Sequence, residues 1–123
     1  LLVIAGVSVA SESKRIRVEV KGLTSCALED KTNTWAMLEL FLDRSQRAVN
    51  YFDAQYGSIE LGADYDLVDG NDVTPRVKVT HNCFSSKIER TFIITLDPVH
   101  DSKTITIPNL ELKDLQSFSF MRA

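Results

Sequence analysis

Arg15-Ile16-Arg17-Val18-Glu19-Val20-Lys21 alternates strictly between charged and β-branched apolar residues. A period of two with one charged side is typical of an antiparallel strand that buries one face and exposes the other to water. Residues 76–81 alternate in the same way. So do residues 88–97, although Ile93 keeps the side opposite Phe92 partly apolar. These three segments are therefore predicted to be half-buried strands.

The apolar runs between them are less regular. Residues 35–43 combine residues that favour helix with Trp35 and Phe41, and the neighbouring strands make a strand the preferred interpretation. Two short runs then flank the segment Asp53-Ala54-Gln55-Tyr56-Gly57, whose Asp and Gly are typical of a hairpin-like turn.

A last strand is predicted over residues 103–107. Pro108 follows it and has no N–H to donate to a neighbour, so this strand is expected at a sheet edge or bulged there. Short strands, turn residues between them and the lack of a convincing long helix predict an all-β fold. The expected architecture is a two-sheet antiparallel β-sandwich of about seven short strands.

Residues 1–10 are almost wholly apolar and place the small residues Ser8 and Ala10 at the −3 and −1 positions of a cleavage site. They fall short of the roughly 20 residues that a membrane-spanning helix needs. We interpret them as a partial signal peptide, with a buried first strand as the alternative. Residues 11–112 then form the sandwich domain of a secreted, extracellular protein, and residues 113–123 form a C-terminal tail without a clear period.

Composition limits the function classes. The 123 residues carry a net charge of −3, with 44% hydrophobic and 25% charged residues, as is ordinary for a globular domain. An excess of acidic residues argues against a general partner of nucleic acid or of anionic membranes, because phosphate contacts need surplus Lys and Arg.

The chain has two cysteines, Cys26 and Cys83. Secretion and an even count favour one disulfide bond between them, with two unpaired buried thiols as the alternative. A bond that closes the loop from Cys26 to Cys83 stabilises the domain by about 4 kcal/mol in the chain-entropy model. No zinc site and no other cofactor is expected, because no Cys-x-x-Cys or His-x-x-x-His spacing gathers the ligands.

His81 shares its side of the predicted strand with Val77 and Val79. One interpretation is a partly buried histidine that is hydrogen-bonded to backbone. The other is a pH-sensitive contact beside the disulfide, because burial and neighbouring groups readily move a histidine across the physiological range.

Residues 63–72 form an acidic segment that is expected to be a loop. Its oxygen ligands make it a calcium candidate, because calcium takes 6–8 of them. The spacing misses that of an EF-hand loop by one residue and lacks the closing Glu, so a solvated loop is the preferred interpretation. The candidate calcium ligands are Asp64, Asp66, Asp69 and Asp72.

Basic residues on the outward sides of the predicted strands are expected to belong to a mixed, solvated surface.

Four segments resemble motifs of the nematode transthyretin-like family. The family's G-x-x-x-C matches Gly22-Leu23-Thr24-Ser25-Cys26, and its D-x-x-G-x-F-x-L-x-G hairpin is similar to residues 53–62, with Ile59 in place of Phe. Its P-x-L-K-I-Y-H-x-C is similar to residues 75–83, and its closing N-L-E-L matches residues 109–112. The resemblance covers residues 15–112. A further Cys that many relatives carry after the His-x-Cys motif is absent here.

The resemblance implies a transthyretin-like or immunoglobulin-like sandwich that is a secreted, non-enzymatic binding protein for a small hydrophobic ligand, a lipid or a cell-surface partner. An alternative is a structural module that self-associates through edge strands, since exposed edges invite pairing. A hydroxyisourate-hydrolase-like enzyme is disfavoured, because the chain lacks that group's N-terminal His motif and C-terminal Tyr-Arg-Gly-Ser. No Gly-x-Ser-x-Gly frames a catalytic serine either.

Overall fold

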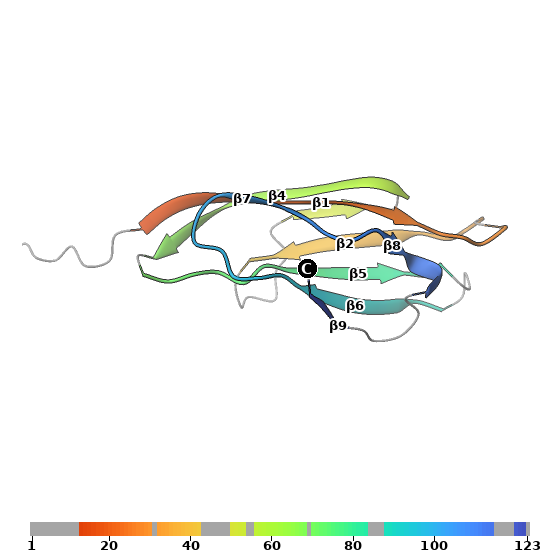
Figure 1. Cartoon of the computed structure of the whole chain (residues 1–123). Coiled ribbons are helices and arrows are strands. Elements are labelled where there is room, and N and C mark those ends of the chain that lie inside the picture. Colours follow the sequence, from red (N-terminus) through yellow and green to blue (C-terminus); the bar gives the residue numbers. More distant parts are fainter. Residues whose placement is uncertain are drawn as a thin grey trace, which may run out of the picture.

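The computed structural model describes residues 13–30, 32–42, 50–53, 56–68, 70–83, 88–114 and 120–122. The predicted signal peptide, residues 1–10, lies outside them. The described chain forms two packed layers of β-strands, and the predicted all-β sandwich is confirmed (Figure 1). Three of the strand pairings in the described chain are parallel, which the alternation of the sequence does not predict.

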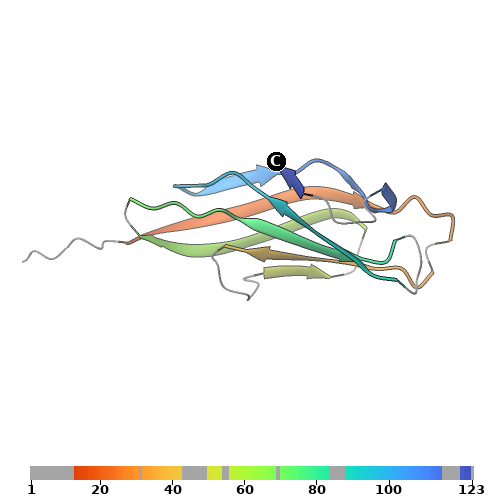
Figure 2. The same cartoon turned by 90° about the horizontal axis from the view of Figure 1, so that it is seen from below.

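The first layer, sheet A, is built around β1 (Ser13–Ser25). β4 (Gly57–Val68) pairs antiparallel with one side of β1 over most of its length. β7 (Lys103–Thr106) and β8 (Leu110–Glu111) pair in parallel with the other side. Exposed Pro108 separates these two, as predicted for an edge strand. β1 and β4 run along most of the length of the molecule (Figure 2).

Gly22 lies where the segment between β7 and β8 packs against β1. A Cβ atom at this position would lie 2.6 Å from Cγ1 of Ile107, which is too close for a side chain. The backbone N–H of Ile107 donates to the carbonyl of Lys21 at 2.9 Å. A glycine at this position therefore allows the chain between β7 and β8 to run close beside β1.

The second layer, sheet B, has the strand order β3-β2-β5-β6-β9. β2 (Ala36–Phe41) is a strand as predicted, because both of its edges are paired, with β3 (Asn50–Asp53) and with β5 (Arg76–His81). β6 (Arg90–Thr95) continues the sheet antiparallel to β5, and β9 (Phe120–Arg122) adds in parallel to β6. The segment expected to be a tail thus contributes a strand to sheet B.

Two local expectations are wrong. The segment around Asp53–Gly57 does not join two strands of one hairpin, because β3 lies in sheet B and β4 in sheet A. The chain instead passes from one sheet to the other there. The acidic segment is not a loop throughout, because its residues up to Val68 belong to β4. Pairing along β1 outweighs the low strand propensity of Asp at these positions.

The core lies between the two sheets and takes its side chains from the inward positions of both. Phe92 is its largest fully buried side chain, and the alternation of β1, β5 and β6 predicts the inward residues correctly. The remaining core residues come from β2, β4, the bridge between Val73 and Val99, and the segment after β7. The core as a whole includes Val18, Val20, Leu38, Leu40, Leu61, Val77, Val79, Ile94, Leu96, Ile107 and Leu112.

Candidate functional site

The disulfide bond joins the two layers at one end of the sandwich. Cys26 directly follows the first described strand of sheet A, and Cys83 follows β5 of sheet B. The sulfur atoms are bonded, the Cα atoms are 5.9 Å apart, and both residues are buried. The predicted pairing is therefore confirmed, and the bond ties one sheet to the other.

His81 lies at the same end and is fully buried. Its Nδ1 accepts a hydrogen bond from the backbone N–H of Cys83 at 3.0 Å, so this nitrogen carries no proton. The ring stands edge-on to that of Phe92, with 6.1 Å between the centroids. The backbone hydrogen bond expected for a structural histidine is thus present, and the pH-sensitive contact stays a prediction.

Asn82 was not singled out by the sequence, yet it organises the loop beside the disulfide. Its backbone N–H donates to the carbonyl of Trp35 at 3.2 Å, and its Oδ1 accepts from the N–H of Trp35 at 2.6 Å. Its Nδ2 donates to the carbonyl of Asn33 at 3.0 Å. The side chain is buried, so the alternation pattern, which concerns apolar residues, gives no signal for it.

Glu111 fastens the last described strand of sheet A to the segment that carries Cys26. One carboxylate oxygen accepts from the hydroxyl of Ser25 at 2.8 Å. The other accepts from the backbone N–H groups of Ala27 at 2.9 Å and Lys113 at 3.1 Å. Desolvation raises the pKa of this carboxyl, but the hydrogen bonds outweigh desolvation, so the pKa lies below its ordinary value.

We expect Glu111→Gln to lower the free energy of unfolding at pH 7 by about 1–2 kcal/mol, because an amide offers one acceptor oxygen instead of two and no charge. A carboxyl with a lowered pKa stabilises the fold above the pKa of the unfolded chain, about 4.3, and this contribution is lost as the pH falls further. Urea unfolding at pH 7 and pH 3 measures both effects.

The matched control is Glu60→Gln on the exposed outer side of β4, which should change the free energy of unfolding by less than about 0.5 kcal/mol. A difference between Glu111→Gln and the parent protein that stays the same from pH 7 to pH 3 would contradict the role of the ionised carboxylate.

Three of the four calcium candidates lie among the described residues. Asp64 and Asp66 point outward from β4 and pair with Arg17 and Arg15 of β1 at 3.3 and 3.1 Å, which matches the expectation of a mixed, solvated surface. Asp69 lies outside the described residues, and Asp72 is exposed. In the part of the chain that the structure describes, no three His, Cys, Asp or Glu side chains are grouped to hold a metal ion.

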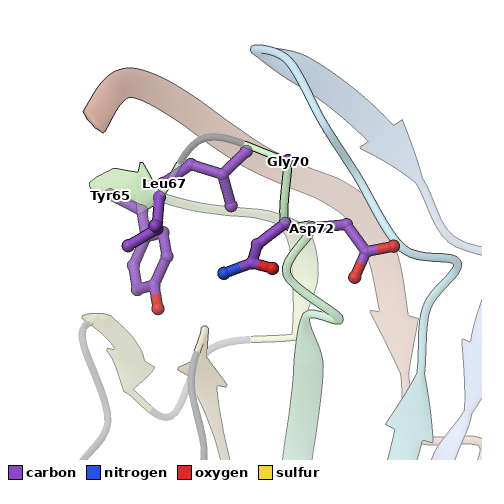
Figure 3. A pocket seen from close by; sticks show the side chains of 6 residues that line it. Tyr65, Leu67, Gly70 and Asp72 are labelled. Carbon is purple, nitrogen blue, oxygen red and sulfur yellow. The ribbon is translucent and has the colours of Figure 1, made fainter. Parts of the chain in front are cut away.

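A hollow of about 250 Å³ lies beside the turn after β4 (Figure 3). Tyr65 and Leu67 line it from the strand, and Gly70, Asn71 and Asp72 line it from the turn. Figure 3 shows the Tyr65 ring and the Asp72 carboxylate pointing in different directions. These two polar side chains therefore do not converge on one ligand atom.

The outer surface of sheet B differs from that of sheet A. The cross-strand register places nine outward positions of β2, β5 and β6 in three rows, which we call the sheet B face. Eight of these residues are half-buried and Thr80 is buried, although all point away from the core. The rows are Met37, Thr80 and Thr91; Glu39, Lys78 and Ile93; and Phe41, Arg76 and Thr95.

A hollow of about 140 Å³ opens on the sheet B face between Phe41, Arg76, Lys78 and Ile93. The guanidinium carbon of Arg76 lies 5.5 Å from the centre of the Phe41 ring, a cation–π distance. Ile93 and the partly apolar outer side of β6 were visible in the sequence. Their proximity to Phe41 and to two cations follows only from the pairing of β2, β5 and β6.

A scan of the chain against protein-family models finds no match, and a search of the curated proteins finds none either. None of the described residues belongs to a helix that is long and apolar enough to cross a membrane.

Proposed function

We propose that this protein is a secreted, non-enzymatic binding protein of transthyretin-like type, and that it recognises a cell-surface partner through the sheet B face. The contrast between the two outer surfaces carries the proposal. On sheet A, the charges of β1 and β4 pair with one another, as in the ion pairs of Arg15 with Asp66 and Arg17 with Asp64. On sheet B, an aromatic and an aliphatic side chain flank two cations around a hollow.

The composition of the sheet B face fits a protein interface. Aromatic residues, Met and Arg are enriched at such interfaces, and the face offers Phe41, Met37 and Arg76. A few anchors of this kind, seated against a pocket, supply most of the binding energy in a typical complex.

The size of the hollows favours this partner over a small hydrophobic ligand. Small-molecule sites usually enclose about 300–1,000 Å³ and bury most of their ligand. The hollows found among the described residues hold between about 140 and about 270 Å³. A volume of this size suits one side chain of a larger partner better than a whole ligand.

The disulfide bond supports an extracellular location. Such bonds persist in oxidising compartments and are rare in the cytosol. The bond between Cys26 and Cys83 closes a sequence separation of 57 residues and is buried between the sheets, as a structural clamp requires. The apolar leader and the resemblance to the nematode transthyretin-like family support the same location.

The test is a binding screen of the refolded, oxidised domain against immobilised extracellular domains, lipid vesicles and a hydrophobic fluorescent probe. We expect saturable binding to at least one extracellular domain. Ile93→Ser should weaken this binding about 10-fold, because it removes an apolar contact at the centre of the face. Leu23→Ser is the matched control and should leave it within about 2-fold. Leu23 is also an outward aliphatic side chain, but on sheet A.

Binding to the fluorescent probe or to vesicles alone would overturn the proposed partner class. Equal losses for Ile93→Ser and Leu23→Ser would overturn the proposed face.

Self-association through edge strands is the second candidate, and the order of sheet A favours it. β4 (Gly57–Val68) is an edge strand of 12 residues in that sheet, and long exposed edges invite pairing with a second copy. Light scattering of the same samples separates the two functions, because a monomer at high concentration excludes a stable edge-paired assembly.

A further inference from the structure

The described residues that line the hollow of the sheet B face include two cations and no carboxylate. Arg76 is engaged with the ring of Phe41, whereas Lys78 forms no ion pair in the part of the chain that the structure describes. Glu39 stands opposite Lys78 in the strand register, but the two side chains do not form an ion pair within 4 Å. Lys78 therefore stands beside Phe41 and Ile93 at this hollow, with no ion-pair partner among the described residues.

This local charge is opposite to that of the whole molecule. The chain has a net charge of −3, and both arginines of β1, Arg15 and Arg17, form ion pairs with Asp66, Asp64 or Glu19. Long-range attraction to any anionic surface is thus weak, because the overall field is negative. An anion is favoured only where it touches the hollow itself, at a distance shorter than the screening length of about 8 Å.

We propose that the sheet B face binds an acidic peptide segment of its partner, in which an aromatic or aliphatic side chain stands next to Asp or Glu. This inference rests on the proposed function and specifies the chemistry of the partner. The apolar side chain fills the hollow between Phe41 and Ile93, and the neighbouring carboxylate meets the ammonium group of Lys78. At about 30 Å³ per water molecule, 140 Å³ is the space of about five waters, which one such side chain displaces.

A membrane is a less suitable partner for the same chemistry. Anionic lipid surfaces attract clusters of several basic residues. The middle row of the face instead alternates Glu39, Lys78 and Ile93, so one acid stands beside the free cation. A peptide with one carboxylate next to an apolar side chain complements this row. The many phosphate groups of a membrane surface do not, because they would also face Glu39.

The test uses fluorescein-labelled nine-residue peptides with a central Asp-Phe-Asp or Glu-Leu-Glu, and the same peptides with Asn or Gln in place of the acids. Fluorescence polarisation should show binding of the acidic peptides at least about 10-fold tighter than of their amide counterparts. Raising the salt concentration from 50 to 500 mM should weaken the binding of the acidic peptides. Lys78→Glu should reduce the affinity by about 10-fold or more.

Lys21→Glu is the matched control and should leave the affinity within about 2-fold. Lys21 is also a lysine at an outward strand position with a glutamate, Glu60, opposite in the register, and the variant changes the net charge equally. Equal binding of acidic and amide peptides, equal losses for the two lysine variants, or no peptide binding would each overturn the inference. Binding to vesicles with 20% phosphatidylserine but not to the peptides would assign the face to a membrane.

The extracellular domain from the binding screen keeps this inference separate from the proposed function. Suppose that the domain binds, that Ile93→Ser weakens the binding and that Lys78→Glu leaves it unchanged. The sheet B face is then the binding surface, but its partner is not acidic. If no domain binds and no peptide binds, both proposals fail.

Discussion

Replacing Cys26 and Cys83 together by alanine should lower the free energy of unfolding by about 4 kcal/mol. The bond closes a sequence separation of 57 residues, and in the chain-entropy model the loss grows with the logarithm of that length. Domains of this size are stable by only about 5–15 kcal/mol, so the variant keeps a small part of its stability. The effect is large because this disulfide bond links the end of β1 in sheet A to the end of β5 in sheet B.

Urea unfolding followed by tryptophan fluorescence measures the change, with and without a reductant that does not absorb. Reduction should destabilise the parent protein by about the same amount and leave the double alanine variant unchanged. If the double variant does not fold at 37 °C, the same comparison is made at 10 °C. A loss of less than about 1 kcal/mol in both comparisons would show that the bond adds little to the packing between the sheets.

Replacing Asn82 by alanine should cost about 3 kcal/mol, the second largest effect. The side chain accepts from the N–H of Trp35 and donates to the carbonyl of Asn33, and it is buried. Its removal leaves a backbone donor and a backbone acceptor without their partners, and each such group costs about 1–3 kcal/mol when it is shielded from water. Asn33, whose carbonyl accepts from Asn82, has a φ of 65° and lies in the left-handed region.

Asn109→Ala is the control for this substitution, because Asn109 is exposed in the connection between β7 and β8. It should change the free energy of unfolding by less than about 0.5 kcal/mol in the same urea titration. If the two alanine variants unfold at the same urea concentration, the hydrogen bonds of Asn82 do not stabilise the fold as described.

The parts that the sequence predicts well are those where one local pattern dominates. Residues 15–21, 76–81 and 88–97 alternate, and the inward members of each are buried as expected. Residues 35–43 show the limit of this reasoning, because their propensities favour helix while the structure has a strand at Ala36–Phe41. Hydrogen bonds to β3 and β5 on both sides decide the matter, and no single-segment propensity contains that information.

The candidate site was less predictable for a related reason. Ile93 shows in the sequence as an apolar residue on the wrong side of its strand, but nothing near it in the chain indicates Phe41 or Lys78. These residues become neighbours because β2, β5 and β6 lie side by side in register. The sequence predicts a loop at Asp64 and Asp66, whereas the structure has a strand there. Their partners on β1, Arg17 and Arg15, are far away in the chain and give no local signal.

The sequence by itself indicated an all-β sandwich with one disulfide bond. A period of two is a local feature of the chain, and a pair of cysteines can be counted. Only the tertiary structure decided which strands adjoin and that three pairings are parallel. It also decided that charges of sheet A pair with one another, while Lys78 of sheet B forms no ion pair with the described residues. The physical reason is that strand order and register depend on contacts between distant segments, and these bring together side chains whose spacing along the chain carries no periodic signal.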